Sequence, residues 1–487
     1  MTDRTDTRGT EVGFIVEAKQ YVLTIEGLPS ARVHDVIVSQ SGSRALVRSL
    51  ADDRLTALAL DPVAPRVGDR YGFLPDDRIF ALGEHLFGRT ITVLGEPIDG
   101  GAPFPAGNAR LTLDAQAPGI DVRAPIAGML ETGVTLIDAL IPIAKGQRQL
   151  LFGGAPGSKA SFLEDVTLHQ ASLGAVCIYA AIGMSLSELE RIERRVMRAA
   201  TGDVILIAAL SDQPSARIML APAIAFEIAA HFQGQGRDVL VILDDLDVHA
   251  KYLREVALLE GRLPGRESYP GDLFYEHAHL LERAGTFVPE FGGGSITALP
   301  VIRSDPNAAL GIVSTNLMST TDGHLAFDPA LEREGAYPAV DEAASITRVG
   351  RLSQTLLEKQ LSLEVRQRLA EAKRQRQYAA FGAPLGKAAA DAVRQADIIM
   401  ALLRQRPGER VPRDLETPLL TLAFTPLLLS KDTAFAAAKR QQLLDGLGAD
   451  PALAELRTSA REGSMPFDAF RRLVEGKQAA FEALCRD

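Results

Sequence analysis

The chain has 487 residues, of which 46% are hydrophobic and 23% are charged, and its formal net charge is -10. A chain of this length is too long for a single hydrophobic core, and its composition is that of an ordinary folded protein. The negative balance argues against a nucleic-acid-binding protein, whose contact surface is basic. The cysteines, Cys177 and Cys485, are too few for a disulfide framework or a cysteine-rich metal site.

The sequence contains no apolar run long enough to cross a membrane. The nearest candidate, "PLLTLAFTPLLL" from Pro418 to Leu429, is interrupted by Pro426 and falls short of the ~20 residues that a bilayer requires. We interpret it as buried helical core. The polar start, "MTDRTDTRGTEVG", lacks the apolar segment of a signal peptide. We therefore expect a cytoplasmic or peripherally membrane-bound protein.

Three segments with different hydrophobic patterns follow one another along the chain. Residues 11–86 carry short alternating segments such as "GFIVEAKQYVLTIEGL", which predict a small antiparallel β-barrel as a domain of residues 1–86. From 87 to 354, near-continuous apolar strands alternate with helical stretches, which predicts a P-loop-type α/β domain with a buried parallel sheet. Residues 355–487 are almost entirely helical in pattern and predict a C-terminal helical bundle.

Residues 149–164 read "QLLFGGAPGSKASFLE", an apolar strand followed by a glycine-rich turn, a lysine and a helical stretch. This is the layout of a phosphate-binding loop, G-x-x-x-x-G-K-[ST], in which backbone N–H groups and the lysine bind phosphate and the hydroxyl binds Mg²⁺. Gly153 and Lys159 have the required spacing. The residues of the predicted loop are Gly153, Gly154, Ala155, Pro156, Gly157, Ser158, Lys159, Ala160 and Ser161.

Two positions of this loop depart from the pattern. Ser158 stands where a glycine allows the backbone to approach the nucleotide, and it would be strained if its φ were positive. Ala160 replaces the hydroxyl residue, and Pro156 removes one N–H from the cradle. Ser161 is no easy substitute, because one residue along a helix turns the side chain by about 100°. We favour a strand-to-helix turn that keeps the architecture without the ligand, and weak nucleotide binding is the alternative.

An acidic pair follows a second apolar strand. The segment "DVLVILDDLD" contains Asp244 and Asp245 at the position of a carboxylate that orders Mg²⁺ through water, although such a pair can also cap the next helix. After the strand "CIYAAIG", Met184 stands where a catalytic relative places the carboxylate that polarises attacking water. Methionine has no acid–base chemistry, so we expect no catalysis at this chain's own site.

Three histidines raise the question of a metal site. His277 and His279 lie at i and i+2 of a predicted helix and do not share a face, and His249 lies on another segment. We therefore expect no metal centre built from these side chains.

Several segments together resemble the α subunit of F-type ATP synthases. They are "ETGVTLIDALIPIAKGQRQLLFGG", "PGRESYPGDLFYEHAHLLERAG", "IVSTNLMSTTDGHLAFD" and "ITRVGRLSQT", in the family's order over roughly residues 11–430. The second is the most specific, because the catalytic β subunit, the V-type B subunit and the secretion-export ATPases carry other residues there. Family members usually carry Gly at position 158, Thr at 160 and Gln at 184, so this chain resembles a divergent form with a degenerate loop.

The resemblance implies roles for two further residues. In that family the catalytic pocket lies mainly on β, and α donates an arginine finger across the interface; its place in "ITRVG" assigns this role to Arg348. Gln405, in "LLRQRPG", falls where the family packs the adenine. The implied cofactors are Mg-ATP at the interface with β, and ATP or ADP with Mg²⁺ at the chain's own loop.

The resemblance also implies partners. These are β subunits alternating with α in a ring of six, a γ central stalk, a peripheral stalk, and the membrane only through the Fo sector, at the cytoplasmic face of a bacterial-type cell membrane. The expected function is that of a non-catalytic, regulatory subunit that couples ATP synthesis or hydrolysis to proton or sodium transport. One alternative is a decayed homologue that serves as a structural or binding subunit of another assembly. A weaker one is a self-sufficient homohexameric ATPase, which the loop disfavours.

Overall fold

The structure is a computed structural model. It describes residues 11–73, 80–104, 116–263, 265, 269–303, 311–380 and 386–485. The chain forms two compact units. One contains residues 1–125, 148–152 and 171–321, and the other contains residues 126–147, 153–170 and 322–487. The predicted three-domain division, with boundaries after residues 86 and 354, stays a prediction.

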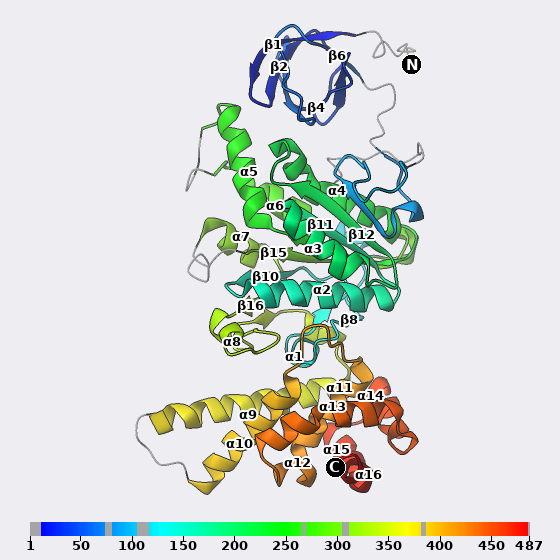
Figure 1. The fold of residues 1–487 in the computed structure, drawn as a ribbon, viewed down its shortest axis with the longest axis vertical. Coiled ribbons are helices and arrows are strands. Elements are labelled where there is room, and N and C mark those ends of the chain that lie inside the picture. The colour runs from blue at the N-terminus through cyan, green and yellow to red at the C-terminus, as the bar shows by residue number, and fades with distance from the viewer. Residues whose placement is uncertain are drawn as a thin grey trace. The chain divides into compact units, whose positions relative to one another are not determined.

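The first unit begins with a closed antiparallel barrel, as the alternating segments predict (Figure 1). Around the barrel the strand order is β1-β2-β5-β4-β3-β6. The strands are β1 (Gly13–Lys19), β2 (Val22–Glu26), β3 (Val36–Ser39), β4 (Arg44–Leu50), β5 (Arg54–Ala59) and β6 (Arg70–Phe73). Alternate side chains fill the interior, including Ile15, Leu23, Ile25, Ile37 and Val47.

The same unit contains the predicted parallel sheet. Its strands lie in the order β10-β15-β13-β11-β12-β7, and each neighbouring pair is parallel. They are β7 (Arg89–Thr92), β10 (Gln149–Gly153), β11 (Val176–Met184), β12 (Val204–Leu210), β13 (Asp238–Asp244) and β15 (Ser295–Val301), and β14 (Gly285–Thr286) pairs antiparallel to β15. The central strands are buried along nearly their whole length, because helices cover both faces of such a sheet.

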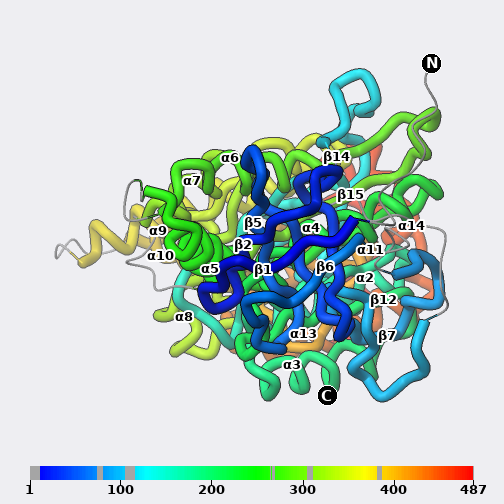
Figure 2. Tube along the Cα trace, turned by 90° about the horizontal axis from the view of Figure 1, so that it is seen from above, coloured from blue at the N-terminus to red at the C-terminus, as the bar shows by residue number. Residues whose placement is uncertain are grey.

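Helix α4 (Ser215–Gln233) packs against β11, β12, β13 and β15. By length and composition it also passes as a membrane span, but 78% of the relevant window is buried, which is the pattern of a core helix. Helix α3 (Leu186–Ile192) follows β11. Figure 2 shows α5 (Leu246–Leu259), α6 (Leu273–Leu281) and α7 (Ile312–Thr320) side by side, as in Figure 1.

A buried ion-pair network ties the barrel to α4. The side chain of Arg217, 7% exposed, donates to the carbonyl of Leu60 at 2.5 Å and to Asp61 at 2.6 Å. Arg44 of β4 donates to Asp61 at 2.8 Å, and both arginines reach Glu96. The network satisfies each buried charge with an opposite one, which is the condition for charges to lie inside a protein.

The second unit is mostly helical in its C-terminal part, as predicted. Its long helices are α9 (Leu356–Ala380), α10 (Lys387–Leu403) and α13 (Thr433–Ala449). Shorter helices are α1 (Thr135–Leu140), α11 (Arg413–Thr421), α12 (Pro426–Leu429), α14 (Ala454–Glu462), α15 (Phe467–Gly476) and α16 (Gln478–Leu484). The segment from Pro418 to Leu429 is mostly buried in α11, α12 and the turn between them, which confirms its interpretation as core.

The second unit also contains the loop region. After β10, α2 (Pro156–Ser172) begins, and a hairpin of β16 (Gly323–Phe327) and β17 (Ile346–Thr347) flanks the short helix α8 (Pro329–Arg333). The strands β8 (Met129–Leu130) and β9 (Ile143–Ala144) form a separate antiparallel pair.

Buried carboxyl groups gather where α1 meets α9 and α11. Asp138 accepts hydrogen bonds from the backbone of Thr132 and Gly133, and yet burial raises its pKa to about 7. Burial and the charge of Asp138 raise the pKa of Glu416 well above its usual value, and one of its oxygens has no hydrogen-bond partner among the described residues. Arg413 is paired with Glu358 nearby, at 2.6 Å.

We expect Arg217→Met to lower the free energy of unfolding by on the order of 3 kcal/mol, because it removes the buried donor to the carbonyl of Leu60 and leaves Asp61 with only one of its two arginines. Urea unfolding measures the effect. The matched control is Arg54→Met, because Arg54 pairs with Glu26 on the exposed surface, where such pairs contribute about 0–1 kcal/mol. Equal losses in the two variants would contradict the role of the network.

We expect Glu416→Gln to stabilise the protein at alkaline pH and to have little effect in acid. The folded pKa of Glu416 is raised, so the folded protein retains this proton, and stability is lost as the pH rises from the unfolded pKa towards the folded one. The amide carries no charge at any pH, so the gain should reach about 1 kcal/mol or more near pH 8. Urea unfolding as a function of pH measures it, with the exposed Glu462→Gln as the control. Parallel curves for Glu416→Gln and the parent would show that the group is not protonated.

Candidate functional site

The glycine-rich turn has the backbone of a phosphate loop. Gly153 has a φ of +107°, and a Cβ placed there would lie 2.1 Å from the carbonyl oxygen of Phe327, so only glycine fits. The N–H of Gly154 donates to the same carbonyl at 3.1 Å. Lys159 is buried, and its ammonium group donates to the carbonyl of Gly153 at 2.6 Å. The lysine therefore binds its own loop.

Ser158 has a structural use in this chain. It lies inside α2, which begins at Pro156, so the strain expected for a positive φ does not arise. Its side-chain oxygen is buried and accepts the backbone N–H of Ala339 at 2.8 Å. The serine connects α2 to the segment that follows α8.

A carboxylate from the same unit lies at the start of α2. Glu332, on α8, accepts the backbone N–H of Ser158 at 2.6 Å. The same oxygen is 2.9 Å from the position that a Cβ on Gly157 would take. The first turn of α2 has no acidic residue of its own, so Glu332 supplies the negative charge that a helix N-terminus favours.

The acidic pair is fully engaged within the other unit. Asp244 has no exposed surface and accepts hydrogen bonds from the Tyr179 hydroxyl at 2.6 Å and from the Arg303 guanidinium at 2.8 and 2.6 Å. Asp245 caps α5 through the N–H of Asp247 and accepts the N–H of Arg303. Burial and the charge of Asp244 raise the pKa of Asp245 to about 6. Asp245 thus caps the following helix, as the sequence suggested as one alternative, and its expected role toward Mg²⁺ stays a prediction.

Met184 is the last residue of β11 and is buried. Its sulfur lies 3.8 Å from the Arg303 guanidinium, which also donates to Glu188 at 3.0 Å. Glu188 belongs to the capping box of α3 together with Ser185. Glu188 is therefore bound to both Arg303 and Ser185. The side chains around Met184 that the structure describes form an ion-paired cluster and supply no unpaired general base.

These residues do not fit a bound Mg-nucleotide. Ala160 offers no ligand to Mg²⁺. The acceptor positions of Asp244 are directed at protein donors, and the N–H of Ser158 is directed at Glu332. The loop and Asp244 belong to different compact units, so their engagement is local in each case.

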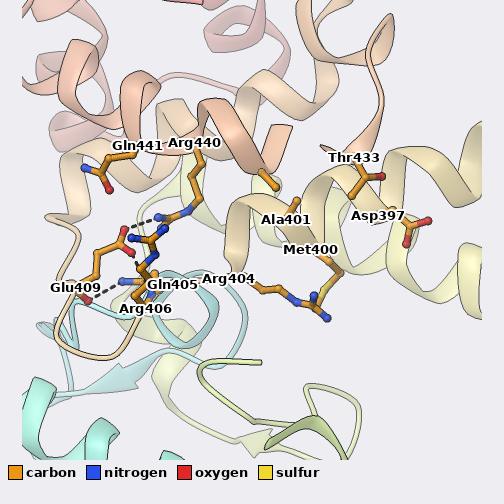
Figure 3. A pocket seen from close by; sticks show the side chains of 11 residues that line it. Asp397, Met400, Ala401, Arg404, Gln405, Arg406, Glu409, Thr433, Arg440 and Gln441 are labelled. Atoms are coloured by element: carbon orange, nitrogen blue, oxygen red, sulfur yellow. Dashed lines mark hydrogen bonds and ion pairs between the residues drawn. The ribbon is translucent and has the colours of Figure 1, made fainter. Parts of the chain in front are cut away.

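Gln405 is also occupied by protein groups. Its side-chain oxygen accepts the N–H of Thr135 at 2.6 Å, and its side-chain nitrogen donates to the carbonyls of Gly133 and Glu409 at 2.9 and 3.0 Å. Gln405 is one of the residues that line a cavity of about 620 Å³. Figure 3 shows these lining side chains. The cavity is lined by α10, α13 and the segment between α10 and α11. Both polar atoms of the Gln405 side chain are therefore paired with backbone groups of the protein.

Arg348 is exposed and follows β17. Its backbone N–H donates to the carbonyl of Asp322 at 2.9 Å, and the preceding Thr347 donates to the carbonyl of Pro142 at 2.9 Å. Gly350 packs so closely on Pro142 that a Cβ would lie 1.7 Å from its carbonyl oxygen. The backbone on both sides of Arg348 is therefore fixed.

His249 and His277 form a buried, hydrogen-bonded pair. The Nε2 of His249 donates to the carbonyl of Met219 at 3.1 Å, so its Nδ1 accepts the Nε2–H of His277 at 3.2 Å. Burial lowers the pKa of His249 to about 4 and that of His277 to about 3, which keeps both rings neutral. His279 instead stacks on Tyr275. Within the described part of the chain, no group of three histidine, cysteine or acidic side chains is arranged for a metal ion.

Sequence reasoning missed Arg303 and Glu332. Arg303 carries a weak signal, because it follows β15, the strand that neighbours the one ending in Asp244. Glu332 carries no local signal, since it resembles any acidic residue of a short surface helix.

The fold and the loop match a known class of nucleotide-binding domain. The family described as "ATP synthase alpha/beta family, nucleotide-binding domain" matches residues 133–347. ATP synthase subunit alpha from Caldanaerobacter subterraneus subsp. tengcongensis is 34% identical over 400 residues, which cover 81% of this chain and 78% of that protein. ATP synthase subunit alpha 2 from Polaromonas naphthalenivorans is 34% identical, with 98% of this chain and 90% of that protein covered. ATP synthase subunit alpha from Dictyoglomus turgidum is 35% identical, with 83% and 80% covered.

The chain therefore belongs to the ATP synthase alpha/beta family, among its F-type α subunits. The barrel, the parallel sheet and the helical C-terminal region are the architecture of that family, and the resemblance of the sequence is confirmed.

Proposed function

We propose that this chain is a non-catalytic, regulatory α-type subunit of a rotary F-type ATP synthase or ATPase. The observation that carries the proposal is Arg348, an exposed arginine on a fixed backbone segment in a chain whose own loop lacks the groups for catalysis. Membership of the α subunits supports the same assignment.

Arg348 acts in trans as an arginine finger. A guanidinium group is always charged and planar, and it neutralises the negative charge that develops on a phosphoryl group during transfer. Such a group has to arrive in one position, because misplacement by about 1 Å reduces the rate strongly. The hydrogen bond of Thr347 and the close packing of Gly350 on Pro142 provide that fixed base.

The chain's own loop takes no part in the reaction. Met184 replaces the carboxylate that would polarise water, and Ala160 replaces the Mg²⁺ ligand. The Mg-ATP that reacts is held at the interface with a β subunit. There this chain provides one side of each pocket.

The partners follow from this role. The chain alternates with β subunits around a γ central stalk, is held by a peripheral stalk, and meets the membrane only through the Fo sector at the cytoplasmic face. ATP synthesis or hydrolysis is thereby coupled to proton or sodium transport. A second function, that of a structural subunit of another assembly, is favoured by one observation: the loop is filled by the protein's own side chains.

The purified chain alone should hydrolyse no ATP, because neither a base nor a Mg²⁺ ligand is present at its loop. Mixing it with its cognate β and γ subunits should give an active particle, and phosphate release measures both. Turnover by the isolated chain that Lys159→Ala abolishes would refute the non-catalytic role.

Arg348→Ala should leave that particle assembled but reduce its ATP turnover by about 10³-fold or more, the effect of losing an arginine finger. Arg348→Lys should recover little, since lysine lacks the planar fork. The matched control is Arg351→Ala, which removes an exposed arginine three residues away. Unchanged turnover of the Arg348→Ala particle would favour the structural-subunit alternative.

A further inference from the structure

We propose that this chain occupies two charged elements of the nucleotide-binding type, one in each compact unit, with its own side chains. Glu332 takes the place of a phosphate at the start of α2, and Arg303 takes the place of a divalent cation at Asp244. The inference concerns the isolated chain, so it does not depend on the proposed role of Arg348.

At the start of α2, the carboxylate of Glu332 takes the place of a phosphate anion. The start of a helix presents unpaired N–H groups and about half a positive elementary charge, which is why phosphate binds there. In α2 the N–H of Ser158 points at a carboxylate oxygen of Glu332 at 2.6 Å, within the range of a charge-assisted bond. Gly157 allows the approach, because a side chain there would meet the same oxygen. An incoming phosphate would have to displace this carboxylate.

The position of Glu332 is set by the segment that also shapes the loop. Asp328 caps α8 by accepting the N–H of Ala330 at 2.7 Å, which fixes the start of that helix. The preceding residue, Phe327, provides the carbonyl that packs on Gly153 and accepts the N–H of Gly154. The segment from Phe327 to Glu332 therefore contacts the loop both at Gly153 and at Ser158. These contacts and the cap of α8 fix the position of Glu332.

At Asp244, the guanidinium group of Arg303 takes the place of a divalent cation. Asp244 is completely buried, and its oxygens receive the two guanidinium hydrogen bonds of Arg303 and the hydroxyl hydrogen bond of Tyr179. A buried carboxylate needs a positive charge, and Mg²⁺ supplies it only with an open, hydrated coordination shell. Arg303 supplies the charge and the hydrogen bonds together. The negative charge of Asp244 is therefore paired with a positive one without a metal.

The alternative explanation is that Glu332 only caps α2 and Arg303 only stabilises the sheet. The two explanations differ in what happens when the side chain is made neutral. A simple cap leaves a less stable protein, whereas a substitute ion leaves a vacancy that the matching ion from solution fills.

The anion half is tested with Glu332→Gln in the full chain, using inorganic pyrophosphate without metal as the probe. We expect the variant to bind pyrophosphate at least about tenfold more tightly than the parent, read as a rise in the melting temperature. The matched control is Glu334→Gln, which removes an exposed carboxylate two residues away and should behave as the parent does. Should Glu332→Gln not unfold cooperatively, Glu332→Asp, which withdraws the carboxylate by one methylene, should show a smaller gain. A parent that binds pyrophosphate as tightly as its variants would overturn the proposal.

The cation half is tested with Arg303→Gln and Mn²⁺ or Mg²⁺ as the probe. We expect the parent to show no metal-dependent change in melting temperature, and the variant to melt lower and to recover when metal is added. The recovery should vanish in Arg303→Gln/Asp244→Asn, and Arg303→Lys, which keeps the charge, should not respond to metal. Arg237→Gln breaks a partly exposed pair with Asp203 and serves as the control. A folded Arg303→Gln protein indifferent to both metals would refute this half, whatever the assembled particle does when Arg348 is changed.

Discussion

The buried charge of Asp244 is the constraint on which the central sheet depends. An uncompensated carboxylate without exposed surface costs several kcal/mol. Here Arg303, just beyond β15, and Tyr179, within β11, compensate it. Arg303 also binds Glu188 at the start of α3. Its guanidinium group therefore joins the end of β13, where Asp244 lies, to the helix that follows β11.

The start of α2 also needs a partner of opposite charge, which here is a negative one. The start of α2 is electropositive, the first turn contains no acidic residue, and Glu332 provides the missing charge from another segment. The architecture of a nucleotide-binding domain thus requires balanced charges at these positions, and the balance does not have to come from a nucleotide. This explains how a chain with Ser158 and Ala160 in its loop keeps the fold of its family, and with it a fixed backbone around Arg348.

Local periodicity was sufficient to predict the barrel, the parallel sheet, the helical C-terminal part and the position of the loop. Those elements depend on residues near one another in the chain, such as the apolar run of β13 or the glycine at 153. The contacts that fill the candidate site were out of reach, because they join distant positions: Ser158 and Glu332 are 174 residues apart, and Asp244 and Arg303 are 59 apart. The sequence likewise showed Ser158 only as a lost glycine, since its partner, Ala339, is 181 residues away.

The hydrogen bond from the Ala339 N–H to the Ser158 hydroxyl makes glycine a costly replacement at position 158. A change to glycine would leave the N–H of Ala339 buried without an acceptor, at a cost of about 1–3 kcal/mol. It would also bring no gain in ligand binding while Glu332 still occupies the start of α2. Glycine, the usual residue of a phosphate-binding loop at this position, would therefore destabilise this chain. Position 158 can therefore accept glycine only together with a second change that gives the N–H of Ala339 another acceptor.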